Sequence, residues 1–256
     1  MAKIEKLVKQ EFEIIVGEHK FQQKLLAKDY FITLLLYLLK DIRGMYFKGG
    51  TALNKTILDH ARISEDIDFT LDRPLKDVKK EIIEAILSSK MFGEVTQDKD
   101  VDKFTRLIAP YDSDIGSGTI FIDLNERGKL FTKPESIPIK HFYPNIPEFC
   151  VSCLSFEEMI AEKMAATIGR NKPRDHYDLY QIVKRKIPID LKLVEKKCKQ
   201  SGDEFDIIKM FNKAKTLHKR WNADLEPLLV EEITFSEVMQ TLARHFKLKY
   251  EKEKLK

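Results

Sequence analysis

The sequence predicts an α+β protein in which a small mixed sheet with flanking helices precedes an all-helical C-terminal domain. Alternating polar and apolar residues, typical of strands, occur between residues 45 and 126. Residues 4–40, and most residues from 155 onward, instead repeat apolar side chains every three or four positions, which is typical of helices. A proline-rich segment separates these patterns and is the best candidate boundary. We therefore expect two domains, residues 1–148 and 149–256.

The individual elements follow from local patterns. Residues 4–40 read as helical, and MYFKGG reads as a short strand ending in a glycine turn. In order after this turn, the patterns predict a helix at 51–61, a strand at 64–72, a helix at 75–90, antiparallel strands at 105–113 and 118–126, and helices at 155–169, 174–185, 190–216 and 234–247. Ser155 and Glu158 form a capping box at the start of the first C-terminal helix.

Composition indicates a globular chain but does not name its partner. The 256 residues are 43% hydrophobic and 34% charged, with a formal net charge of +4. This mild excess is compatible with a nucleotide or RNA partner, although a solvated charged surface explains it as well. The longest apolar run, at 30–39, is far shorter than the ~20 residues needed to span a bilayer, and the N-terminus carries no apolar signal segment. We expect no membrane contact and a cytoplasmic location.

The three cysteines do not indicate a metal site. Cys150 and Cys153 form a single CxxC, and zinc would require a second ligand pair that is not evident. Both lie in an apolar, strand-like stretch, where we expect them to pack in the core. Unpaired cysteines agree with a reducing compartment.

The turn Gly49-Gly50-Thr51 is a candidate phosphate-binding loop. Two glycines let the backbone approach a phosphate closely, and the unpaired amides at the start of a helix attract an anion. The Thr51 hydroxyl could add a direct hydrogen bond. A glycine pair alone marks ordinary turns more often than phosphate sites.

Asp66 and Asp68 are candidate magnesium ligands. Strand alternation places both carboxylates on one face, where two like charges repel unless a cation lies between them. Asp123, in the apolar context IFIDLN, could supply a third carboxylate, or it could be a surface residue at a strand end. A lone DxD is also common on solvated strands. The order of glycine turn, helix and DxD strand is more informative, because it brings loop and carboxylates to the same end of adjacent strands.

Four segments together resemble the AbiEii/AbiGii toxin family of nucleotidyltransferases, which share the polymerase-β-type fold. They are AKDYFITLLLYLL, GGTAL, RISEDIDF and FEEMIAEKMAATIGRNKPRDHYDLYQI, which follow in order between residues 27 and 182. The gap between Gly50 and Asp66 is longer than in the wider polymerase-β pattern, and it suits this toxin-like branch.

The resemblance implies roles for specific residues. Gly49, Gly50 and Thr51 would bind triphosphate, with Ser64 in the loop beside the active site. Asp66 and Asp68 would hold two Mg²⁺ ions, which Mn²⁺ could replace, and Asp123 is the candidate third ligand. Lys163 matches the functional lysine of the family, and Asp175 and Asp178 match its last acidic motif; one of these two aspartates would be essential.

The C-terminal residues also have structural interpretations. Lys163 lies on an apolar helix face, so it either extends to solvent or meets a phosphate in a site. Asp175 at a helix start could serve as a cap, and Asp178 lies one turn further on the same face. The basic cluster of Arg170, Lys172 and Arg174 could contact nucleotide or RNA, or be solvated.

Three functions remain open at this point. The first is a magnesium-dependent nucleotidyltransferase that moves NMP from an NTP to an acceptor hydroxyl, in a cleft between the two domains. By resemblance it would be a bacterial toxin of phage defence, with a separately encoded antitoxin and the tRNA 3′ end as acceptor; a small molecule or a protein hydroxyl is the alternative acceptor. The second is a nucleotide-binding module without turnover. The third, a helical scaffold, leaves the motifs unexplained.

Overall fold

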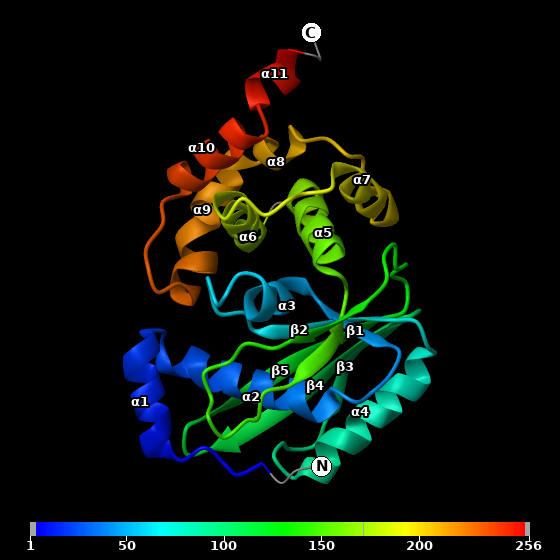
Figure 1. The fold of residues 1–256 in the computed structure, drawn as a ribbon, viewed down its shortest axis with the longest axis vertical. Helices are drawn as coiled ribbons and strands as arrows, with labels where there is room; N and C mark the ends of the chain where they lie inside the picture. The colour runs from blue at the N-terminus through cyan, green and yellow to red at the C-terminus, as the bar shows by residue number, and fades with distance from the viewer. Residues whose placement is uncertain (1–3, 171, 254–256) are drawn as a thin grey trace. The chain divides into compact units, whose positions relative to one another are not determined.

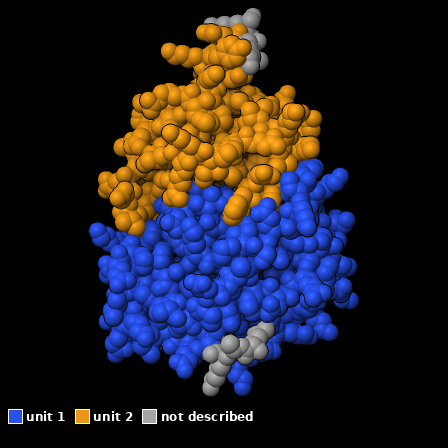
Figure 2. Space-filling model, in the orientation of Figure 1, with its two compact units in different colours: residues 1–154 blue, residues 155–256 orange. Residues whose placement is uncertain are grey.

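The computed structural model describes residues 4–170 and 172–253. The chain divides into two compact units, residues 1–154 and 155–256, which Figure 2 draws in separate colours. The division lies after Leu154 and not after residue 148, because the strand Cys150–Cys153 belongs to the sheet of the first unit. Each unit is described by itself below.

Unit 1 is built on a seven-stranded mixed sheet with strand order β3-β4-β5-β2-β1-β7-β6 (Figure 1). Its strands are β1 (Met45–Lys48), β2 (Asp66–Leu71), β3 (Thr96–Val101), β4 (Phe104–Ser113), β5 (Gly116–Asn125), β6 (Glu135–Pro138) and β7 (Cys150–Cys153). The pairs β2–β5 and β1–β7 are parallel, and the other neighbouring pairs are antiparallel. The predicted mixed sheet is confirmed.

Four helices flank this sheet: α1 (Lys9–His19), α2 (Gln23–Leu39), α3 (Gly49–Thr56) and α4 (Leu75–Ser89). The predicted helical stretch 4–40 is two helices, because Lys20 adopts a left-handed conformation with φ 57° and ends α1. α2 contains the apolar run and is buried along most of its length, with α2 and α4 packed against β5. Among the described residues, no helix combines the length and apolar character that crossing a bilayer requires.

Two strands and one cysteine differ from expectation. β3 is exposed along its whole length, so it lacks the apolar alternation that reveals a strand. β6 lies in the proline-rich segment and pairs with β7. The strand-like stretch predicted at residues 149–156 contains β7, but of its two cysteines only Cys153 is buried; Cys150 is exposed, so its assignment to the core is wrong.

All regular secondary structure in the described residues of unit 2 is helical. It contains α5 (Phe156–Gly169), α6 (Pro173–Lys184), α7 (Leu191–Gln200), α8 (Lys209–Asn212), α9 (Ala214–Leu225), the 3₁₀ turn η1 (Glu226–Leu228), α10 (Phe235–His245) and α11 (Leu248–Glu253). The Ser155 side chain accepts a hydrogen bond from the Glu158 amide at the start of α5, as the capping box predicts. Pro173 occupies the first turn of α6, where its missing N–H costs nothing. The predicted α+β class is therefore confirmed.

Candidate active site

The predicted phosphate loop is the junction of β1 and α3. Lys48 ends the strand, and the helix begins at Gly49, whose φ of +81° is a conformation that other residues rarely adopt. The first amides of a helix have no partner within it, so the turn presents N–H groups at the positive end of the helix dipole. The structure thus gives this loop the geometry of an anion site.

Gly49 lies directly against the carboxylate of Asp68. A Cβ added to Gly49 would lie 2.3 Å from Asp68 Oδ2, far inside normal contact. This proximity follows from the antiparallel pairing of β1 with β2, in which Lys48 is opposite Asp68. The prediction that loop and carboxylates meet at the same end of adjacent strands is confirmed.

A row of charged residues crosses four strands at this level. Lys48 on β1 is opposite Asp68 on β2, Asp68 is opposite Asp123 on β5, and Asp123 is opposite Arg106 on β4. Residues directly opposite each other share a face, with Cβ atoms about 4.5–5.5 Å apart in antiparallel pairs. Asp66 shares this face by strand alternation, and both DxD residues are partly exposed. Lys48 and Arg106 are absent from the residues that the motifs had identified.

Asp66 lies in an environment that disfavours its charge. Partial burial raises the pKa of its carboxyl, and the neighbouring Glu65 and Asp123 raise it further, against the lowering effect of Lys28 and Arg106. Crowded carboxylates of this kind are stabilised by a bound cation. The electrostatics of the DxD pair therefore fit a site for a divalent ion.

Asp123 is engaged by a guanidinium. Arg106 Nε donates to Asp123 Oδ1 at 2.6 Å and Nη2 donates to Oδ2 at 2.7 Å, a bidentate pair. Within residues 4–170 and 172–253, no three His, Cys, Asp or Glu side chains come together as a metal-binding group. Asp66 and Asp68 offer the hard carboxylate oxygens that Mg²⁺ prefers, whereas Asp123 in this conformation is bound to Arg106.

Thr51 and Ser64 have different positions relative to the loop. The Thr51 hydroxyl donates to the backbone oxygen of Asp66, and the side chain is buried, so in this conformation it ties α3 to β2 and does not present its proton to a ligand. A Cβ added to Gly50 would lie 2.7 Å from Arg62 Nη2 and 3.3 Å from Ser64 Oγ. Ser64 and the buried Arg62 therefore lie beside the glycine loop.

In unit 2, the structure brings Lys163, Asp175 and Asp178 together. Lys163 Nζ on α5 lies 2.9 Å from Asp175 Oδ1 and 3.0 Å from Asp178 Oδ2 on α6. The lysine side chain is only 5% exposed, so it does not extend to solvent. The two aspartates are three residues apart on one helix face, which lets both reach one ammonium group.

Arg170 closes the other side of Asp175. Its Nε lies 2.7 Å from Asp175 Oδ2 and its Nη2 lies 3.0 Å from Oδ1. Burial alone would raise the pKa of the Asp175 carboxyl, but the charges of Lys163 and Arg170 lower it well below the usual range. Arg174, in the first turn of α6, donates to the backbone oxygen of Asp224.

Comparison with known proteins identifies the family. The family described as "Nucleotidyl transferase AbiEii toxin, Type IV TA system" matches residues 39–244. The chain belongs to this family. No curated protein matches the sequence. As an AbiEii-family member the protein is a nucleotidyltransferase, and the predicted family resemblance is confirmed.

Solved structures share the AbiEii-type fold over most of the chain. MenT4, a nucleotidyltransferase toxin from Mycobacterium tuberculosis, is 20% identical, with a TM-score of 0.63 and coverage of 93% of this chain and 99% of that chain. JHP933 from Helicobacter pylori is 19% identical, with a TM-score of 0.61 and coverage of 92% and 97%. At these identities the likeness shows the fold alone.

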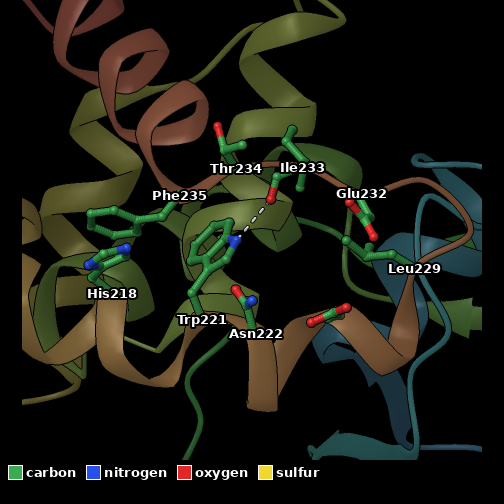
Figure 3. Close-up of a pocket in the computed structure, with 9 residues that line it drawn as sticks. His218, Trp221, Asn222, Leu229, Glu232, Ile233, Thr234 and Phe235 are labelled. Carbon is green, nitrogen blue, oxygen red and sulfur yellow. Dashed lines mark hydrogen bonds between the residues drawn. The ribbon is translucent and has the colours of Figure 1, made fainter.

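Unit 2 of this AbiEii-family chain also contains a pocket of about 310 Å³ that none of the predicted site residues lines (Figure 3). Trp221 donates its indole N–H to the Ile233 oxygen at 3.0 Å, which holds the loop before α10 against α9. The Phe235 ring packs near both His218 and Trp221, with ring-centroid distances of 5.0 and 5.4 Å. These contacts join α9 to the start of α10, and the pocket lies where the two helices meet.

Proposed function

We propose that the protein moves a nucleoside monophosphate from an NTP to an acceptor hydroxyl in a magnesium-dependent reaction. The contact of Gly49 with the Asp68 carboxylate carries this proposal. It supports a site in which helix amides that suit a triphosphate and carboxylates that suit a divalent ion lie within one substrate's reach. Family membership supports the same chemistry.

The residues of unit 1 have distinct parts in this reaction. The amides at Gly49 and Gly50 would bind the negatively charged phosphates, with Ser64 beside them. Asp66 and Asp68 would hold two Mg²⁺ ions, or Mn²⁺ in their place, and bound metal would polarise the α-phosphate and stabilise the leaving pyrophosphate. Arg106 would orient Asp123 and lower the electrostatic cost of three neighbouring carboxylates.

The cluster of Lys163, Asp175 and Asp178 is the second group that we assign to the activity. The supporting observation is that the Lys163 ammonium lies within hydrogen-bonding distance of two buried carboxylates. The three residues are those that the sequence motif had identified. Buried titratable groups that perturb one another in this way are frequently found at functional sites. One of these aspartates, or Asp123, would assist deprotonation of the acceptor hydroxyl. The prediction that both halves contribute to one site stays a prediction.

The biological setting follows from the family. Its description names toxins of type IV toxin–antitoxin systems, and MenT4 is named as a nucleotidyltransferase toxin. We propose that this protein acts as such a toxin in phage defence, that a separately encoded antitoxin opposes it, and that its acceptor is the 3′ end of tRNA. A small-molecule or protein hydroxyl is the alternative acceptor.

A transfer assay tests the proposal. The protein is incubated with each α-labelled NTP, Mg²⁺ and total RNA, beside an Asp66→Asn/Asp68→Asn variant that keeps the size of both side chains. Label that enters tRNA only with the unmodified protein supports the proposal. NTP binding measured by calorimetry, without label in RNA, protein or small molecules, would instead favour a nucleotide-binding module without turnover.

A further inference from the structure

α2 contains a buried acid that the site described above does not use. Asp29 is 2% exposed in a helix whose other buried residues are mostly apolar. Its Oδ1 and Oδ2 atoms lie 2.8 and 2.9 Å from Nζ of Lys55, which is 1% exposed in the last turn of α3. Asp29 belongs to the segment AKDY that marked the family in the sequence, where nothing showed what the acid contacts.

Buried hydroxyl groups complete this ion pair. Lys55 Nζ donates to Thr33 Oγ1 at 2.9 Å, and Tyr143 Oη donates to Asp29 Oδ2 at 3.0 Å. Burial raises the pKa of Asp29, but the charge of Lys55 and the hydrogen bonds from Lys55 and Tyr143, with a contribution from His60, together shift the pKa of Asp29 downward. The nearby His60 stays neutral, because burial and the Lys55 charge lower its pKa to about 3. The cluster thus holds one positive and one negative charge.

The Asp29–Lys55 ion pair helps to set the position of α3. α3 has eight residues, and helices this short are not stable alone, so contacts with the rest of the unit set its position. Thr51 and Lys55 lie one turn apart on one face of α3: the first ties the helix to β2 at Asp66, and the second ties it to α2. Asn54 Nδ2 also donates to the Gly50 oxygen at 2.9 Å.

We propose that the Asp29–Lys55 ion pair is a positioning device that holds the N-terminus of α3, and with it the amides of Gly49 and Gly50, at the correct place beside Asp68. This inference rests on the proposed function for its effect on nucleotide binding. A displaced α3 weakens contacts that the triphosphate makes before and during the reaction alike. Loss of the pair therefore raises KM for the NTP more than it lowers kcat.

The test removes both charges at once, in an Asp29→Leu/Lys55→Met variant. Replacing a buried ion pair by apolar residues of similar size is often neutral for stability, whereas removing one partner leaves an uncompensated buried charge. Tyr143 keeps the Leu26 oxygen and Thr33 keeps the residue 29 oxygen as acceptors, so neither hydroxyl is stranded. Tyr143→Phe is the matched control, because it perturbs the same cluster and leaves the tie to α3 in place.

Steady-state kinetics and ¹⁵N-glycine NMR provide the readouts. We expect the double variant to raise KM for the NTP about tenfold with kcat within about threefold, and to move the amide resonances of Gly49 and Gly50. Tyr143→Phe should leave KM within about twofold and both resonances in place. An unchanged KM in the double variant, or an equal rise in Tyr143→Phe, would overturn the inference. If the double variant does not fold, Lys55→Arg replaces it, with the same expected direction.

The glycine resonances also separate the two proposals. If the unmodified protein neither binds nor transfers a nucleotide, the proposed function fails while the resonances still report whether the pair positions α3. If the protein is active and the resonances of Gly49 and Gly50 do not move in the double variant, the positioning inference fails alone.

Discussion

Replacing Gly49 by alanine should reduce activity strongly while lowering the stability of the fold only slightly. The residue has φ +81°, which costs an L-amino acid about 1–2 kcal/mol. Its new Cβ would lie 2.3 Å from Asp68 Oδ2, so the carboxylate must move by about 0.7 Å to reach even the 3.0 Å that real Cβ contacts rarely undercut. The substitution therefore displaces either the loop or the proposed metal ligand.

The expected effect on activity is much larger than that on stability. A loss of about 1–2 kcal/mol from a typical 5–15 kcal/mol leaves the protein folded at 25 °C and lowers Tm by about 2–8 °C. Misplacement of reacting groups by about 1 Å can cost about 100-fold in rate, so kcat/KM for label transfer should fall by about that factor. Circular dichroism melting and the transfer assay measure the two effects in parallel.

Gly17→Ala provides the matched control. Gly17 lies in α1, and a Cβ there would meet no atom within 4 Å, so this variant should be as active as the unmodified protein and no less stable. A Gly49→Ala protein with nearly normal turnover would refute the reasoning, because it would show that the contact between the loop and Asp68 is not required in the active conformation.

Four further outcomes are expected. Lys163→Met removes the ammonium group that contacts the buried carboxylates of Asp175 and Asp178 and should cost about 3–5 kcal/mol in urea unfolding; an unfolding curve like that of the unmodified protein would contradict this. Asp178→Asn should lower kcat in the transfer assay and should cost less stability in urea unfolding than Lys163→Met does. Because the pKa of His60 is about 3 when folded and about 6.5 when unfolded, the unfolded chain binds more protons between these values, so stability falls as pH drops from about 6.5. A His60→Gln variant should lose part of this pH dependence of Tm. Arg106→Leu should move the acid limb of the kcat/KM profile to higher pH, because Arg106 lowers the pKa of Asp66; an unmoved limb would exclude this coupling.

The parts of the site that depend on local rules could be predicted from the sequence. Strand alternation puts Asp66 and Asp68 on one face whatever the rest of the chain does, and a glycine pair before a helix exposes amides wherever it occurs. The contact between Gly49 and Asp68 is different, since it depends on the register of β1 against β2. The sequence predicted proximity at the strand ends but not this contact.

The Arg106–Asp123 pair was missed although the sequence contains a signal for it. The turn between β4 and β5 closes at the pair Ser113–Gly116, and counting back along both strands from this turn brings Arg106 opposite Asp123. Hairpin register therefore accounts for the isolated acid in an apolar strand. Asp29 and Lys55 offer no comparable signal, because they are 26 positions apart on two different helices and no local pairing rule brings them together. β3 was missed because its residues are all exposed and therefore show no alternating apolar pattern.

The contacts of Lys163 could not be predicted from the sequence of α5 alone. On α5 alone, a lysine on an apolar face has two outcomes, extension to solvent or contact with a phosphate. The structure adds neutralisation by Asp175 and Asp178, which follow on the next helix at a spacing that puts both on one face. A phosphate that bound Lys163 would share the charge of its ammonium group with these two carboxylates. Asp178→Asn therefore separates the roles: if Lys163 binds the nucleotide, removing one competing charge strengthens NTP binding even as turnover falls, and if Lys163 only holds the carboxylates in place, NTP affinity is unchanged.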